Sequence, residues 1–260
     1  AIIEYNRMRK CTRLLPEGEA AAGIWPWSCD NTLIQYNEVS GMVGTNDGEA
    51  FDSDNNCENT IFQYNYTHDN QGGFMLICCS PDDSSIGNVS TTVRYNISQN
   101  DGDFALVEGD GAFSIYKDAV NVQIYNNVFY VGPHLDIRAM RFTHGGCTGD
   151  SSFLNNIWYV DGRVTWVFED YTNYYFCKNV FYGNCINRPA NYSGLTSNPM
   201  FVSPGSGGSG IDSVTGYMLQ NGSPCLGTGQ KMRDNGGRDY WGNAVPTDSS
   251  PDIGAHQKSQ

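Results

Sequence analysis

The chain has 260 residues and a formal net charge of −13, with 28 acidic against 15 basic residues. This balance excludes the basic stripe that nucleic-acid binding requires, and it disfavours binding to an anionic membrane surface. No apolar run reaches the ~18 residues that a membrane span needs. Charged residues make up only 17% of the chain and 30 residues are glycine, which favours short strands and turns over helices.

One motif recurs from the first residues onward. An apolar residue is followed three positions later by Asn, as in Ile3 and Asn6. The same Asn recurs, in steps of 31, 28, 31, 31, 29 and 23 residues, at Asn6, Asn37, Asn65, Asn96, Asn127, Asn156 and Asn179. The copies are rich in Gly, Asn and β-branched residues, which excludes helical repeats, and propeller blades need longer copies. We therefore predict an all-β protein, a right-handed parallel β-helix of about seven coils over residues 1–197.

The recurrent Asn is predicted to be structural. One Asn per coil can pass hydrogen bonds to the Asn of the coils above and below it. The alternative is that each Asn only tolerates a left-handed turn conformation. Because the chain opens inside a copy of the motif, we also expect an N-terminal cap to be missing.

A second strand is expected before each Asn motif. The candidates are Gly23–Ser28, Ala50–Asp54, Gly73–Cys78, Phe104–Glu108, Ile137–Phe142 and Val164–Glu169. Successive side chains of a strand point to opposite faces. In the second candidate, Phe51 and Ser53 would therefore face the core, and Asp52 and Asp54 would face solvent side by side.

The densest acidic cluster lies at this strand, where DGEAFDSD places four carboxylates in residues 47–54. Two outward carboxylates two residues apart are roughly 6.5–7 Å apart along a strand. This separation lies near the lower end of the range that inverting glycosidases use, so Asp52 and Asp54 are candidates for an acid–base pair. With Asp69 they could instead bind calcium. The third alternative is a solvated acidic face.

Other candidate site residues lie on the same expected face or next to it. His68, followed by Asp69, could act as a base or as an orienting group, or could be an ordinary turn residue. Trp25, Trp27 and Trp166 could stack on sugar rings, or could be packed in a cap or the core. Glu108 and Arg141 are candidate substrate-binding charges. No required cofactor is predicted, and calcium is the one candidate ion.

The nine cysteines and the N-x-S/T sequons favour an extracellular setting. Candidate glycosylation sites are Asn65, Asn88, Asn96 and Asn191. Cys29 and Cys57 hold the same place in successive copies, CDNTLIQYN and CENTIFQYN, which predicts either a thiol stack or a disulfide.

The tail departs from the motif after residue 197 and contains NPMFV, YMLQNGSPCLGTG, DYWGNAVP and PDIGAHQ. A solenoid needs its last coil covered, so residues 198–260 are predicted to form a loop and a C-terminal cap. Together with the Asn motif, these phrases resemble the right-handed β-helix, pectate-lyase-like superfamily and the ending common in its secreted bacterial members.

The resemblance implies a fold more than an activity, since the superfamily includes lyases, hydrolases, epimerases, tailspikes and adhesins. Asp52 and Asp54 resemble the aspartate pair of its polygalacturonase-like members, but their Gly-His-Gly and Arg-x-Lys motifs are absent. Its pectate lyases use calcium bound by carboxylates together with an arginine base, which Asp52, Asp54 and Arg141 could imitate.

The sequence therefore predicts a secreted carbohydrate-active protein, a polysaccharide hydrolase or lyase that binds a glycan in a groove on one sheet face. The alternatives are a glycosylated structural β-helix that assembles end to end into filaments, and a glycan-binding protein without catalysis.

Overall fold

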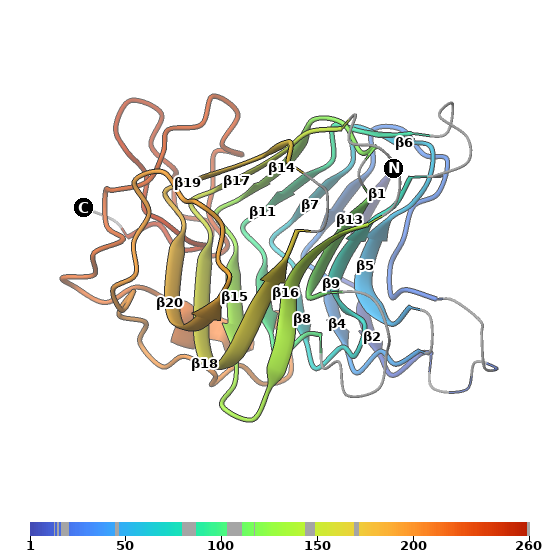
Figure 1. Ribbon diagram of the computed structural model, residues 1–260, viewed down its shortest axis with the longest axis horizontal. Coiled ribbons are helices and arrows are strands. Elements are labelled where there is room, and N and C mark those ends of the chain that lie inside the picture. The colour runs from blue at the N-terminus through green and yellow to red at the C-terminus, as the bar shows by residue number, and fades with distance from the viewer. Residues whose placement is uncertain are drawn as a thin grey trace.

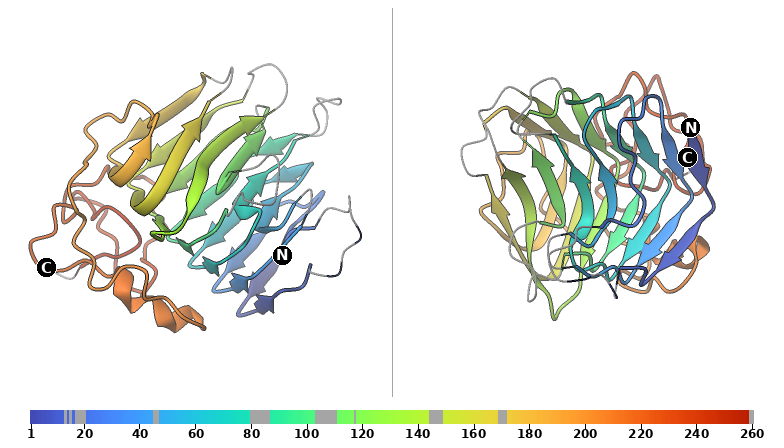
Figure 2. Two further views of the ribbon diagram at one scale, coloured as in Figure 1. Left: turned by 60° about the horizontal axis from the view of Figure 1, so that its bottom comes forward. Right: turned by 90° about the vertical axis from the view of Figure 1, so that its right-hand side faces the viewer.

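The computed structural model describes residues 1–12, 14, 16, 21–44, 47–79, 87–102, 111–116, 118–143, 149–168 and 172–258, without the side chains of 141–143. Its strands lie side by side in parallel and wind into a coil, with the N-terminal strands at one end and the C-terminal residues at the other (Figure 1). The right-hand view of Figure 2 shows the same coil from its N-terminal side. Among the described residues, no helix is long and apolar enough to cross a membrane.

One side of the coil is a seven-stranded parallel sheet. Its strands, in spatial order, are β1 (Ile2–Glu4), β3 (Leu33–Gln35), β7 (Ile61–Gln63), β11 (Thr92–Arg94), β14 (Val122–Tyr125), β17 (Ser151–Leu154) and β19 (Tyr174–Cys177). Each is the apolar stretch that precedes a recurrent Asn. A two-stranded sheet pairs β6 (Cys57–Glu58) with β10 (Asn88–Val89).

The other two sides belong to one larger sheet. Its first part follows the recurrent Asn and contains β2 (Arg7–Arg9), β4 (Glu38–Ser40), β8 (Tyr66–His68), β12 (Ile97–Gln99), β15 (Val128–Val131) and β20 (Val180–Ile186). Its second part contains β5 (Glu49–Ser53), β9 (Gly73–Ile77), β13 (Phe113–Tyr116) and β16 (Asp136–Thr143). The long strand β18 (Ile157–Val167) pairs with both parts and so joins them.

The second strands confirm four of the six predicted stretches in β5, β9, β16 and the end of β18. Gly23–Ser28 forms only a bridge, between Ile24 and Phe51. Phe104–Glu108 lies outside the described residues. The strand found between β9 and β16 is instead β13, which the sequence analysis did not single out.

The predicted asparagine ladder is confirmed. The side-chain oxygen of each recurrent Asn accepts a hydrogen bond from the backbone N–H of the Asn one coil earlier, over 2.9–3.0 Å from Asn6 through Asn179. The residue before each Asn, such as Tyr36 with φ 54°, takes the left-handed conformation. The ladder therefore satisfies polar groups inside the coil. The alternative, that each Asn itself takes a left-handed backbone conformation, is wrong for these seven positions.

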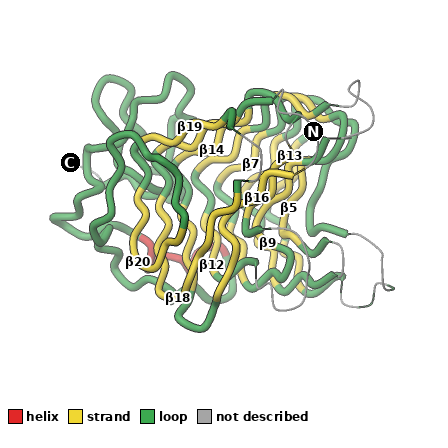
Figure 3. The backbone as a smooth tube through the Cα atoms, in the orientation of Figure 1, coloured by secondary structure: helices red, strands yellow, loops and turns green. Residues whose placement is uncertain are grey.

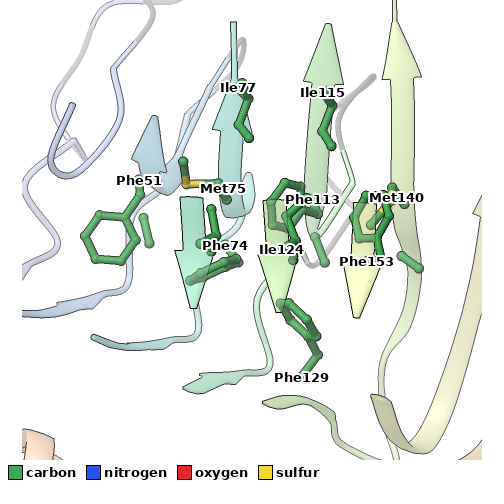
Figure 4. Close-up of a cluster of buried hydrophobic side chains, with 14 of the residues drawn as sticks. Phe51, Phe74, Met75, Ile77, Phe113, Ile115, Ile124, Phe129, Met140 and Phe153 are labelled. Carbon is green, nitrogen blue, oxygen red and sulfur yellow. The ribbon is translucent and has the colours of Figure 1, made fainter. Parts of the chain in front are cut away.

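Inward side chains stack in register inside the coil. Phe51, Met75, Phe113 and Met140 are paired from strand to strand and each is fully buried (Figure 4). Aromatic rings from the other sides meet them, such as Phe62 of β7 against Phe51 at 5.6 Å between ring centroids. Burial of each such side chain contributes about 1.5–3 kcal/mol.

The C-terminal segment lies along the outside of the coil. It contains the 3-10 helix η1 (Ile211–Tyr217), shown in Figure 3 beside the strands. Phe201, Val214, Tyr217 and Ile253 pack on a row of outward side chains that includes Tyr66 and Ile97. These contacts are lateral, so the cap over the last coil remains a prediction.

Candidate active site

The best candidate site lies on the outer face of β5, next to the segment of Trp25 and Trp27. The bridge of Ile24 with Phe51 sets Trp25 opposite Asp52. The Asp54 amide donates to the Pro26 carbonyl over 3.1 Å, so the register continues and sets Trp27 opposite Asp54. Ile24 and Pro26 are buried, whereas the tryptophans are 48% and 61% exposed. Two exposed indoles therefore border two carboxylates, as the sequence predicted.

The two carboxylates differ in their exposure. Asp54 is half-buried, but Asp52 is only 6% exposed, so the prediction that both face solvent openly is wrong for Asp52. Asp52 lies in the middle of a strand, and its neighbours in the row are Trp25 and Leu76. Both neighbours carry large side chains, which leave little of the carboxyl open to water.

Asn88 holds the end of β5 in place. Its side-chain nitrogen donates to the backbone oxygens of Ser53 and Asp54, over 2.6 and 3.2 Å, and its oxygen accepts from the Thr91 hydroxyl. Asn88 is fully buried. It is therefore a positioning residue for the acidic strand, a role that the sequence analysis did not assign to it.

Cys78 lies next to the two carboxylates, directly after the neighbouring strand β9. Its backbone N–H donates to the Ser53 carbonyl over 2.9 Å. Burial, and then the negative charges of Asp52 and Asp54, raise the pKa of the Cys78 thiol far above its ordinary value. Cys78 thus stays a protonated thiol and is a poor nucleophile.

His68 belongs to a separate charge network on β8. Its Nδ1 lies 2.8 Å from Asp69 Oδ2, and its Nε2 lies 3.2 Å from Glu38 Oε1. Arg7 Nε pairs with the other oxygen of Glu38 at 3.0 Å. Burial lowers the pKa of His68, but the bonds to Asp69 and Glu38 outweigh it, so the pKa is raised. His68 therefore orients Asp69 and does not reach the row of Asp52.

Comparison with known proteins bears on both fold and function. The structure resembles that of the pectate lyase Pel9A with a TM-score of 0.55, over 99% of this chain and 65% of that one, at 14% sequence identity. The chain is a right-handed parallel β-helix. No protein-family model matches it.

A curated relative is the lacto-N-biosidase of Bifidobacterium longum subsp. longum, which is 29% identical over 267 aligned residues. The alignment covers 92% of this chain and 15% of the relative. The chain thus spans about one seventh of the length of that enzyme.

Trp166 is not a substrate-binding residue of this β-helix. It pairs with Met140 in the inward row, is 2% exposed, and packs its ring against Trp158 and Phe181. The prediction was wrong because the pairing of β18 with β16 points Trp166 inward, one residue away from the positions that point outward. The backbone of Arg141 does lie in the outward row, opposite Ser114. The side chain of Arg141 and all of Glu108 lie outside the described residues.

The three predicted calcium ligands do not come together. Asp52 is paired with Leu76 of β9, whereas Asp69 precedes β9 and is bound by His68. Among the described residues, no group of three or more His, Cys, Asp or Glu side chains could hold a metal ion. The three-residue set is therefore wrong, and calcium binding by Asp52 and Asp54 alone remains a prediction.

The sequons coincide with structural asparagines. Asn65, Asn88 and Asn96 are at most 1% exposed, and each uses its side-chain nitrogen in two or more hydrogen bonds. An attached glycan would replace one of these donated hydrogens and would need open space, so the structure contradicts these three sites. Asn191 is half-buried and forms a further rung of the ladder, 3.2 Å from the Asn179 amide.

The described cysteines are all free thiols, so the disulfide alternative for Cys29 and Cys57 is not found. Cys57 is buried, and its thiol donates to the Pro26 carbonyl over 3.3 Å. Cys147 lies outside the described residues.

The sequence analysis also missed a cavity of about 380 Å³ at the bends between the two parts of the large sheet. Its lining comes from turns: Val43, Asp69, Gln71, Asn100, Gly132, Pro133, His134 and Leu135. Asp69 and Asn100 hold left-handed conformations at equivalent bends of successive coils. Bend residues at a constant interval after the ladder Asn were the available signal.

Proposed function

We propose that the chain is the β-helix of a secreted glycoside hydrolase that acts on a neutral oligosaccharide bound across the outer face of β5. Asp52 and Asp54 are the acid–base pair, and Trp25 and Trp27 are the platform for sugar rings. The observation that carries the proposal is the register of Trp25 with Asp52 and of Trp27 with Asp54. Aromatic faces suit the apolar faces of sugars, and here they lie one strand spacing, roughly 5 Å, from the carboxylates.

The proposed mechanism uses the different exposure of the two carboxyl groups. Asp54 is the more exposed of the two and removes a proton from the attacking water molecule. Asp52 is sheltered and donates its proton to the oxygen of the leaving sugar as the glycosidic bond breaks. A spacing of roughly 6.5–7 Å leaves room for that water molecule and corresponds to inversion at the anomeric carbon.

Hydrolysis is favoured over a lyase reaction for two reasons. Elimination requires a uronic acid, and a polyanionic substrate is repelled by a protein of net charge −13. The lacto-N-biosidase relative is, by its name, a glycosidase. Oligosaccharides that contain a lacto-N-biose unit are therefore the first substrates to test.

The test compares Asp52→Asn and Asp54→Asn with the unchanged chain on a panel of neutral oligosaccharides. Either substitution should lower kcat at least 100-fold, in keeping with the contribution of a positioned acid or base. Asp30→Asn is the matched control, because Asp30 is an exposed aspartate one coil earlier, where it pairs with Glu58. Activity that survives both changes would refute the acid–base assignment.

The exposure of the tryptophans also favours a second candidate, glycan binding without turnover. Calorimetry distinguishes the two functions. Binding that persists while the unchanged chain releases no product on any substrate of the panel would favour the binding module.

A further inference from the structure

The cavity at the bends of the large sheet is built from four successive coils. Val43 follows β4, Asp69 and Gln71 follow β8, Asn100 follows β12, and residues 132–135 follow β15. A hydrogen bond joins two of these turns, since the Asn100 side-chain oxygen accepts the Gly132 amide over 2.9 Å. The cavity is therefore a preformed feature of the turns.

The lining has the composition of a small-molecule site. Val43, Pro133 and Leu135 provide apolar surface, while Asp69, Gln71, Asn100 and His134 provide a carboxylate, two carboxamides and an imidazole. Polar groups set beside apolar surface are typical of binding sites, and about 380 Å³ lies at the lower end of their usual volumes. Among the described residues of the lining there is no Lys or Arg that could neutralise an acidic ligand.

Asp69 is the charged group of this lining, and its orientation is fixed. His68 holds Asp69 Oδ2 at 2.8 Å and is itself held by Glu38, which Arg7 pairs from the other side. The His68 ring stacks on Tyr66 with 4.8 Å between centroids. The Asp69 side chain remains 61% exposed. A surface carboxylate is thus anchored through a partly buried imidazole to a buried carboxylate.

We propose that this cavity is a subsite for a short neutral saccharide, and that Asp69, positioned by His68, accepts hydrogen bonds from its hydroxyl groups. The class of ligand rests on the proposed function, whereas the site itself rests on separate residues. A neutral sugar has the apolar ring faces and the hydroxyl edges that the lining matches.

The network makes binding depend on pH. Both nitrogens of His68 face carboxylates, so only the protonated ring can donate to Asp69 and Glu38 at once. The charged and titratable groups around His68 are Glu38, Asp69, Asp101 and Tyr66, with Arg7 behind Glu38. As pH rises through the raised pKa of His68, the neutral ring releases one carboxylate, and the orientation of Asp69 is lost.

Calorimetry with lacto-N-biose as the probe, together with steady-state kinetics, tests the subsite. Asp69→Asn should weaken binding about tenfold, as expected for one hydrogen bond to a charged group. It should raise KM in proportion with little change in kcat, whereas Asp54→Asn lowers kcat. Affinity of the unchanged chain should fall as pH rises from the ordinary histidine pKa through the raised pKa of His68, and His68→Gln should remove this pH dependence. Asp30→Asn is again the control.

The outcomes separate the two proposals. Unchanged affinity and KM in Asp69→Asn would overturn the subsite while leaving Asp52 and Asp54 as the catalytic pair. A loss of affinity in Asp69→Asn, with full activity in Asp52→Asn and Asp54→Asn, would support the subsite and overturn the proposed reaction. Lack of any binding by the unchanged chain would overturn the subsite.

Discussion

The two outer faces of the large sheet differ although the same coils build them. One, the covered face, carries the row of Tyr66, Ile97, Val128 and Ile157 beneath the C-terminal segment. The other, called the open face after the exposed Trp25 at its start, carries Trp25 and Asp52 in a row that continues to Leu76 and Ser114, which are buried like Asp52. Strand geometry fixes which side chains point outward on both faces, and what lies against a face decides whether they are apolar or polar.

The apolar row of the covered face ends at charged residues. The row that contains Tyr66 continues into Glu38 and Arg7, and Glu38 pairs with both Arg7 and His68. The C-terminal segment therefore stabilises the coil, while the faces beyond it remain for ligands. Removing contacts from the covered face should cost stability, and removing side chains from the open face should cost binding.

Tyr217 provides the largest expected effect. It is fully buried on the covered face, donates to Gln99 Oε1 over 2.6 Å and packs against Phe201 and Tyr130. Tyr217→Ala should lower the free energy of unfolding by about 3–5 kcal/mol, measured by chemical denaturation. Tyr217→Phe should retain most of that stability. A loss below about 1 kcal/mol in Tyr217→Ala would mean that the segment is not docked as described.

His256 provides a smaller, pH-dependent effect on the same face. Its Nδ1 accepts the Leu219 amide over 3.0 Å, and burial lowers its pKa, although Asp239 and Asp252 oppose the shift. A lowered pKa in the folded state means that acid favours unfolding. The stability that His256 contributes is complete above about pH 6.5 and is lost as pH falls to the lowered pKa.

The loss of stability in acid should be on the order of 1 kcal/mol for each pKa unit by which folding lowers the pKa of His256. Thermal unfolding between pH 7.5 and 4.5 measures it, with His256→Gln as the comparison because Gln keeps an acceptor without titrating. The two proteins should differ in the slope of Tm against pH. Equal slopes would show that His256 does not titrate in this window.

Trp27 provides the smallest effect on stability and tests the open face. Its side chain is 61% exposed, so Trp27→Ala should change the free energy of unfolding by less than about 0.5 kcal/mol. The same change should weaken oligosaccharide binding, because it removes the platform next to Asp54. A large loss of stability would show that the Trp27 side chain stabilises the fold, as the side chains of the covered face do.

The fold could be predicted because its rule is local and repeated. Asn65 and Asn96 each follow a tyrosine in the same sequence pattern, and each donates to the Asn of the next coil, so a pattern in the sequence was enough. The candidate site could be predicted only in part. Alternation placed Phe51 inward and Asp52 outward, but the exposure of Asp52 depends on side chains one coil away. Trp166 was misplaced because the phase of a long strand is set by its partners.

The cavity and the covered face could not be predicted for a different reason. His134 and Gln71 lie in turns of different coils, and nothing in the local sequence shows that these turns meet. The same holds for Tyr217 and Gln99, whose hydrogen bond joins positions 118 residues apart.

The asparagine ladder also separates what this molecule can vary from what it must keep. The rungs from Asn6 to Asn179 are 23 to 31 residues apart in the chain, yet the hydrogen bonds between them are nearly identical. Segments between rungs can therefore lengthen or shorten without disturbing the coil, because the added or missing residues lie in the turns at its corners. The ladder acts as a fixed frame with interchangeable loops, so new recognition surfaces could be grafted at the corners, one coil at a time.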